Sequence, residues 1–300
     1  MDEREFDSLI KQAQLSYQQG DLHKTLKYCL LAKKINQTSD LLIDIALLYD
    51  ELKDYDGAKQ YYTLALELEP EQERAYYGLG TVYEALNQVD AAIAHYNEAI
   101  NLNNDYTAAH FFIANLYDDL KQKPLAMYHY QKVIELAPDH FYAHLNLGSI
   151  YEIIGENDQA LNYFLKAESL NNNHHLLYFN LGVVYRKLGR TDACIKSYQK
   201  SLAISPLYSF TFLNLAIVYK DDLNDLEQAI KIYTKGITHH LKEAVLYYNR
   251  GCAYALINEY EAAIKDLNEA IKYNPSLRDY VYSDQELDVL RETDLFKKTF

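Results

Sequence analysis

Apolar and small residues recur along this 300-residue chain at helical spacing, and the whole pattern repeats every 34 residues. One small residue marks the register of each period, and a tyrosine follows it three residues later. The small residues are Ala46, Gly80, Ala114, Gly148, Gly182, Ala216 and Gly251, and the tyrosines are Tyr49, Tyr83, Tyr117, Tyr151, Tyr185, Tyr219 and Tyr254. The pattern therefore predicts a protein built from stacked copies of one supersecondary unit.

A second small residue follows the first after twelve or thirteen positions, and a bulky residue stands four positions further on. The small residues are Ala58, Ala92, Ala126, Ala160, Cys194, Ala229 and Ala263, and the bulky ones are Tyr62, Tyr96, Tyr130, Phe164, Tyr198, Tyr233 and Leu267. The two sets define two helices per repeat, here called helix A and helix B. Small side chains let their backbones approach closely, so we predict tight antiparallel pairs.

Glycine or asparagine falls midway through several repeats, at Gly20, Asn87, Gly155, Gly189 and Asn258. These residues tolerate the left-handed conformation in which a helix ends, so we predict the turn between helix A and helix B there. The seventh repeat holds one extra residue within 220–228. We expect this insertion to lengthen a loop and to leave the stack intact.

Residues 76–99, YYGLGTVYEALNQVDAAIAHYNEA, carry the aromatic, Leu-Gly, Tyr, Ala pattern at fixed offsets. This pattern resembles the tetratricopeptide repeat. The resemblance implies an all-α, right-handed superhelical solenoid of eight antiparallel helix pairs over residues 1–276. The first repeat is degenerate, because Tyr17 sits one place late and Thr25 replaces alanine. Half of the 30 tyrosines occupy repeat positions, which indicates a packing role.

The period ends after Pro275, and residues 277–300 form a separate segment. Ser283 and Glu286 have the spacing of a capping box in front of Leu287 and Leu290. We predict a C-terminal capping helix whose leucines cover the apolar face of the last repeat.

The formal net charge of -14 disfavours nucleic acid as a partner, because binding phosphates requires a basic surface. The sequence has neither a long apolar span nor an N-terminal leader pattern, so we expect a cytoplasmic protein that does not enter membranes. Its three cysteines, Cys29, Cys194 and Cys252, are too widely spaced for a disulfide framework or a CxxC metal site. We expect them to be buried, reduced thiols.

The eight repeats leave no stretch for a separate catalytic domain, and the chain lacks the P-loop, GxGxxG, GxSxG and HExxH motifs. The histidine pairs 174–175 and 239–240 fall where exposed inter-repeat loops are predicted, and adjacent rings cannot easily turn toward one ion. We therefore expect no catalytic residue, no metal site and no cofactor.

Asparagine recurs on the face of helix A that points away from helix B, which is the predicted inner, concave wall. With the small residue of helix A taken as position 8, Asn146, Asn180, Asn214 and Asn249 all occupy position 6. An amide there offers a donor and an acceptor to an extended peptide backbone. The row resembles the asparagine ladder of O-linked N-acetylglucosamine transferase repeats, which holds substrate backbones. Hydrogen bonds between adjacent helices are the alternative role.

The same wall carries apolar residues and two cations, and we predict that they contact the peptide with the asparagines. The apolar residues are Tyr142, Phe179, Val183, Phe210 and Tyr248, and the cations are Arg186 and Lys187. The cations would meet an acidic group of the peptide. Packing between neighbouring A helices is the competing role for the apolar residues at position 5.

The function that we predict is a non-catalytic scaffold that binds a protein or peptide partner of unknown identity. The chain would be a monomer or a weak homo-oligomer. The alternative is a structural scaffold that self-associates through its terminal repeats, and a helical-repeat RNA-binding protein is a weaker third possibility. The partner itself does not follow from the sequence, because repeat folds host many functions.

Overall fold

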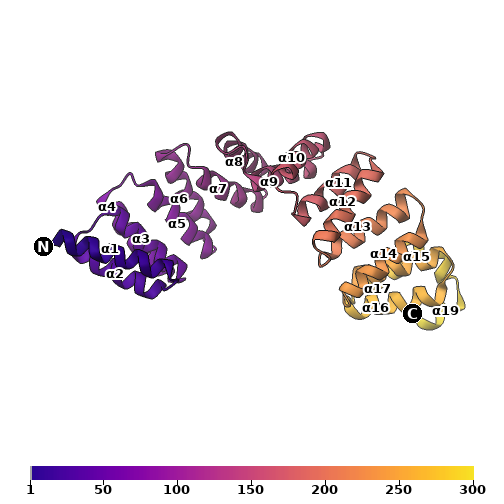
Figure 1. The fold of residues 1–300 in the computed structure, drawn as a ribbon. Helices are drawn as coiled ribbons and strands as arrows, with labels where there is room; N and C mark the ends of the chain where they lie inside the picture. The colour runs from indigo at the N-terminus through magenta and orange to yellow at the C-terminus, as the bar shows by residue number, and fades with distance from the viewer. Residues whose placement is uncertain (1) are drawn as a thin grey trace. The chain divides into compact units, whose positions relative to one another are not determined.

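The computed structural model describes residues 2–300, and the described residues form helices and turns without a strand (Figure 1). The chain divides into two compact parts, one ending at Ala143 and the other beginning at His144. The all-α array of consecutive helix pairs that the sequence predicts is confirmed.

The N-terminal part holds four helix pairs, and the C-terminal part continues from the helix that contains the boundary. The first eight helices are α1 (Asp2–Gln18), α2 (Leu22–Ile35), α3 (Ser39–Glu51), α4 (Tyr55–Leu68), α5 (Glu73–Ala85), α6 (Val89–Leu102), α7 (Thr107–Asp119) and α8 (Lys123–Leu136). The next eight are α9 (Phe141–Ile153), α10 (Asn157–Leu170), α11 (His175–Lys187), α12 (Thr191–Ile204), α13 (Ser209–Ile217), α14 (Leu226–His239), α15 (Ala244–Leu256) and α16 (Tyr260–Tyr273).

The small residue of helix A lies against the bulky residue of helix B in the same repeat, as predicted. A Cβ atom added to Gly182 would stand 2.4 Å from Cε1 of Tyr198, and one added to Gly148 would stand 2.7 Å from Cε1 of Phe164. Both rings are fully buried. Close approach of the two helices therefore depends on the small side chain, and the aromatic ring fills the space that it leaves.

The tyrosine of helix A makes a second recurring contact, with a ring on helix B. Tyr49 stacks on Tyr61 with ring centroids 5.3 Å apart, and Tyr151 stacks on Tyr163 at the same distance. Such pairs add to the apolar burial of the repeat. The packing role predicted for the periodic tyrosines is confirmed at these positions.

All five residues predicted at the turns between helix A and helix B have positive φ angles, from 56° at Asn87 to 88° at Gly155. Lys53 and Lys121 adopt the same conformation with φ of 61°, although neither lysine is a residue that predicts it. The turn geometry of the repeat thus overrides the local preference of lysine, which disfavours the left-handed region.

The insertion in the seventh repeat does not simply lengthen a loop, and this prediction is partly wrong. Helix α13 ends at Ile217 and runs into a π-helical turn, η1 (Val218–Asp222), before Asn224 turns the chain with φ of 53°. A π-turn accommodates one extra residue inside a helix. The π-turn therefore carries Lys220, Asp221 and Asp222.

The C-terminal segment consists of several short elements rather than one helix: α17 (Leu277–Ser283), the 3-10 turn η2 (Gln285–Leu287), α18 (Asp288–Arg291) and α19 (Asp294–Thr299). The capping box prediction is wrong. Asp284 is the cap, since its Oδ1 accepts a hydrogen bond from the backbone N–H of Glu286, whereas the Ser283 hydroxyl donates to the Asp279 carbonyl. Leu287 and Leu290 are fully buried against residues of α15 and α16, as the sequence predicts.

Candidate peptide-binding surface

The predicted asparagine row separates into side chains with different partners. Asn180 on α11 donates from Nδ2 to Oγ of Ser149 on α9, 3.1 Å away. Asn214 on α13 and Asn249 on α15 instead donate to the carbonyl four residues earlier in their own helices, each at 2.8 Å. Asn146 is half-buried on α9. Bridging between helices, the alternative role, is therefore present at Asn180, while Asn214 and Asn249 bond only within their own helices among the residues that the structure describes.

The oxygen atom of the Asn214 amide remains available to a partner. In the described part of the chain, Asn214 Oδ1 accepts no hydrogen bond from the protein. Phe210 lies one helical turn earlier on the same face and exposes 56% of its surface. An exposed ring beside an available amide oxygen is suited to a peptide side chain and its backbone N–H.

The remaining apolar residues of the predicted wall differ in exposure. Phe179 and Val183 are half-buried and pack against the core around α12 and α13. The Phe179 ring meets Tyr208 edge-on with centroids 5.1 Å apart, which is the packing role expected for position 5. Tyr142, near the start of α9, is 51% exposed.

The C-terminal segment covers the hydroxyl group of Tyr248. The Tyr248 hydroxyl donates to Oδ2 of Asp284 at 2.6 Å. Burial, followed by this hydrogen bond, raises the pKa of Tyr248 above its ordinary value. Tyr248 thus connects the last repeat to its cap.

The two cations of the predicted wall are paired with carboxylates of neighbouring helices. Arg186 binds Asp222 with Nε and Nη2 at 2.8 and 2.9 Å, and the π-turn places Asp222 in this position. Lys187 pairs with the Glu152 carboxylate and donates to the Glu152 carbonyl. An acidic peptide group would have to displace an ion pair to reach either cation.

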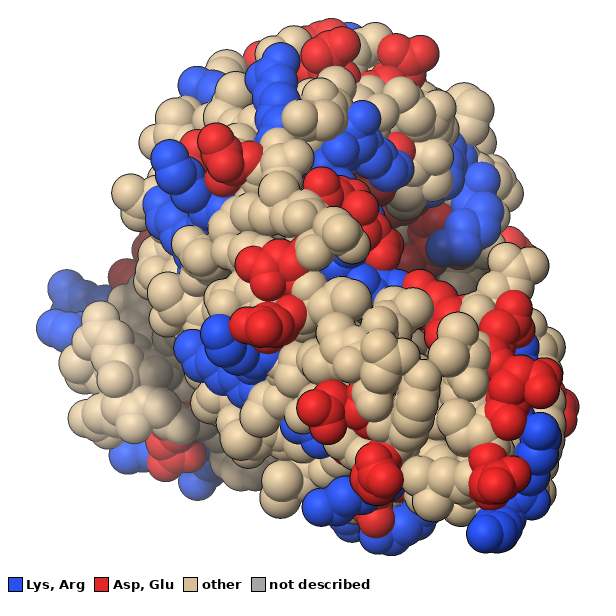
Figure 2. Space-filling view, turned by 90° about the vertical axis from the view of Figure 1, so that its right-hand side faces the viewer, with Lys and Arg blue, Asp and Glu red and all other residues tan. Residues whose placement is uncertain are grey.

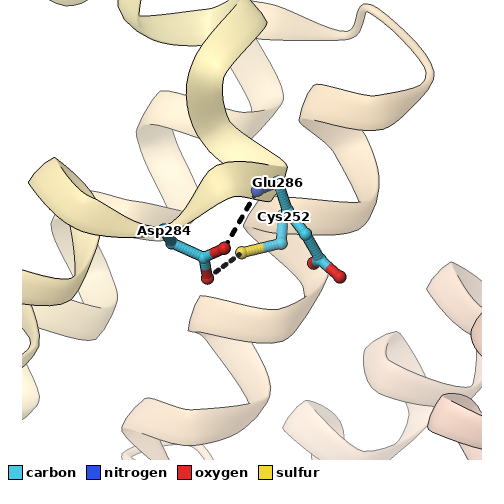
Figure 3. Close-up of side chains that lie close together, drawn as sticks. All are labelled: Cys252, Asp284 and Glu286. Carbon is cyan, nitrogen blue, oxygen red and sulfur yellow. Dashed lines mark hydrogen bonds between the residues drawn. The ribbon is translucent and has the colours of Figure 1, made fainter.

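One group of side chains in the described part of the chain has the donor types of a metal site: Cys252, Asp284 and Glu286 (Figure 3). The Cys252 thiol is directed at the Asp284 carboxylate, 4.0 Å away. Burial, and then Asp284, raises the pKa of Cys252 to about 12, so the thiol stays protonated. Lys220, whose side chain is 10% exposed, pairs with Glu286. Each donor therefore has a protein partner, and the group fastens the C-terminal segment to η1 and α15.

Other motifs of interest also have structural partners. Arg250 makes a bidentate ion pair with the buried Asp266, at 2.6 and 2.8 Å. His174 and His175 are half-buried at the start of α11, so the prediction of an exposed loop is wrong there. His239 is exposed as expected, but it is the last residue of α14 and stacks on Phe212 with centroids 5.7 Å apart. Among the described residues, none of the helices combines the length and apolar character needed to cross a bilayer.

Charge is mixed on the face shown in Figure 2, where acidic and basic side chains alternate. Sequence reasoning missed Lys220, Asp222 and Asp284, although each has a partner of complementary chemistry about one repeat away or in the cap.

Comparison with known proteins shows the family. Tetratricopeptide repeat models match residues 51–116, 107–140, 129–162, 175–207 and 244–277, which together make up more than half of the chain.

Solved structures show the same fold at low identity. The C-terminal part of a repeat protein from Cytophaga hutchinsonii is 16% identical, with a TM-score of 0.67 over 81% of this chain and 99% of that one. A tetratricopeptide repeat protein from Parabacteroides merdae is 19% identical, with a TM-score of 0.59 over 85% and 99%. YrrB, described as a TPR protein with an unusual peptide-binding site, is 23% identical, with a TM-score of 0.55 over 61% and 95%. The chain belongs to the tetratricopeptide repeat family, whose stacked repeats form extended surfaces for binding other proteins.

Proposed function

We propose that this protein-interaction scaffold binds an extended peptide segment along the A helices of its C-terminal part, with α13 at the centre of the contact. The observation that carries the proposal is the pairing of Phe210 and Asn214 on one face of α13. Phe210 exposes 56% of its surface, and among the described residues the Asn214 amide bonds only within its own helix. Aromatic residues are enriched at protein interfaces relative to the rest of the surface.

Asn180 has a different role in this proposal. Its bond to Ser149 joins α9 and α11, and Ser149 in turn donates to the Leu145 carbonyl at 3.0 Å. Replacing Asn180 therefore removes a contact inside the protein, whereas replacing Asn214 removes a contact with the partner. The two asparagines occupy the same repeat position, so they form an internal comparison.

The proposal is tested by selecting binding peptides from a displayed random library on the full chain, and then measuring their affinity for variants. We expect Asn214→Ala and Phe210→Ala each to weaken the selected peptide about tenfold, because each removes a contact at the centre of the interface. Asn162→Ala is the matched control, since Asn162 is exposed on α10 and lies outside the row. An unchanged affinity in Asn214→Ala and Phe210→Ala would reject this surface, as would a library that yields no binder.

A further inference from the structure

A cleft lies between α1, α2 and α3 in the N-terminal part, far in sequence from the asparagine row. Its volume is about 490 Å³, and its lining combines apolar side chains with acid groups. Ala13, Cys29, Leu41 and Leu48 are buried and form the apolar lining. The polar lining includes Asp44 and Glu51, which lie on the same face of α3 two turns apart.

The cleft exists because the first repeat lacks the aromatic ring of its helix B. Cys29 stands four residues after Thr25, at the place that later repeats fill with a bulky side chain. Those side chains are Tyr62, Tyr96, Tyr130, Phe164, Tyr198, Tyr233 and Leu267. In the third repeat a Cβ on Gly80 would stand 2.5 Å from the Tyr96 ring, whereas Ala13 of the first repeat faces the much smaller Cys29. The missing ring leaves a hollow of side-chain size.

The charges around the hollow are predominantly negative. Asp44 is exposed, and it forms an ion pair with Arg74, whose Nη2 lies 3.8 Å away while Nη1 is closer to Asp40, at 3.1 Å. Glu51 accepts a hydrogen bond from the Tyr17 hydroxyl at 2.9 Å. Because the phenol carries no positive charge, this bond does not neutralise the Glu51 carboxylate. The pKa of Asp44 is raised, first by loss of surrounding water, with Arg74 opposing the change and Asp40 adding to it.

We propose that this cleft binds a lysine or arginine side chain of a cationic protein segment. The apolar stem of either residue would lie against Cys29 and Leu48, and its charged end would meet Asp44 and Glu51. An aromatic side chain would also fill the hollow, but it would remove water from the carboxylates without compensating their charge. The surface uses the first two repeats, so it is independent of the peptide contact proposed on α13.

Fluorescence anisotropy on the full chain tests this proposal with a labelled peptide of alternating arginine and glycine. Peptides with glutamine or phenylalanine in place of arginine provide the comparison. We expect binding of the arginine peptide to weaken about tenfold in Cys29→Tyr, which restores the ring of the later repeats, and by a similar factor in Asp44→Asn. Higher salt should weaken it further.

The control is Asp56→Asn, which changes net charge by the same amount at a side chain on α4 that is 94% exposed. It should leave the affinity unchanged. Equal losses in Asp44→Asn and Asp56→Asn would overturn the proposal in favour of diffuse attraction, and tighter binding of the phenylalanine peptide would overturn the cationic occupant. If Cys29→Tyr does not fold, the comparison of the two aspartate variants decides the outcome. If Asp44→Asn weakens the arginine peptide but still binds the peptide selected for α13 with unchanged affinity, the two surfaces act independently.

Discussion

Acidification should loosen the fourth repeat before the rest of the N-terminal part, because two histidines are buried against each other there. His110 on α7 and His129 on α8 are 3% and 7% exposed, and their Nδ1 atoms are 2.9 Å apart. Nε2 of His110 lies 3.1 Å from the Asn104 carbonyl and must carry a proton to bond it. In the neutral pair, His129 therefore donates from Nδ1 to the bare Nδ1 of His110.

The direction of the effect follows from the pKa of the folded state. Burial, and then the neighbouring His110, lower the pKa of His129 from 6.5 to about 4. The unfolded chain therefore binds the proton first, and stability is lost as pH falls below the unfolded value. For His129 alone, this linkage lowers the free energy of unfolding by about 2 kcal/mol between about pH 7 and about pH 5. The lowered pKa of His110 adds to this loss.

Hydrogen exchange with mass spectrometry, corrected for intrinsic rates, measures the opening free energy of residues 107–136 at each pH. His129→Phe should remove most of the pH dependence, because it keeps a ring beside Tyr117 but cannot take up a proton. His23→Gln is the control, since His23 is exposed on α2. The reasoning is refuted if His129→Phe loses as much protection between these pH values as the wild-type chain does.

Three further predictions concern the C-terminal part. Asp266→Asn should destabilise it by about 3 kcal/mol in urea unfolding followed by circular dichroism, because Arg250 loses its buried partner. Glu269→Gln, which removes an exposed pair with Lys272, should have no measurable effect. Leu290→Ala should cost about 3 kcal/mol and speed hydrogen exchange in α15 and α16, since a fully buried leucine is lost from the cap. Cys252 should react with iodoacetamide at neutral pH only after unfolding, as mapped by mass spectrometry, because its pKa is about 12.

The repeat period predicts the helix pairs and their small-to-bulky contacts because both are local consequences of one recurring pattern. The sequence predicts the turns less completely. Gly155 and Asn87 signal a left-handed residue, but Lys53 adopts the same φ region without any signal. The packed helices on both sides fix the geometry of that turn, and the cost of a left-handed lysine is small enough for the packing to outweigh it.

The errors at the seventh-repeat insertion and at the Ser283 cap have a common physical cause, which is competition between alternative hydrogen bonds. A one-residue insertion fits either a longer loop or a π-turn, and the choice of η1 depends on contacts that form only in the folded chain: Lys220 with Glu286 and Asp222 with Arg186. Ser283 and Asp284 are both acceptable caps from sequence. The structure selects Asp284, whose other oxygen also binds the Tyr248 hydroxyl.

The period itself contains a signal for the ion pairs of Arg186 and Lys187. Side chains at corresponding positions of adjacent A helices are about one repeat apart in sequence, and polar partners recur at that separation. It is 34 residues for Tyr17 with Glu51, 35 for Lys187 with Glu152 and 36 for Arg186 with Asp222. Complementary side chains at this spacing are therefore expected to pair within the solenoid. Among the described residues Asn214 bonds only within its own helix, so it is a stronger candidate for contact with another protein than either cation.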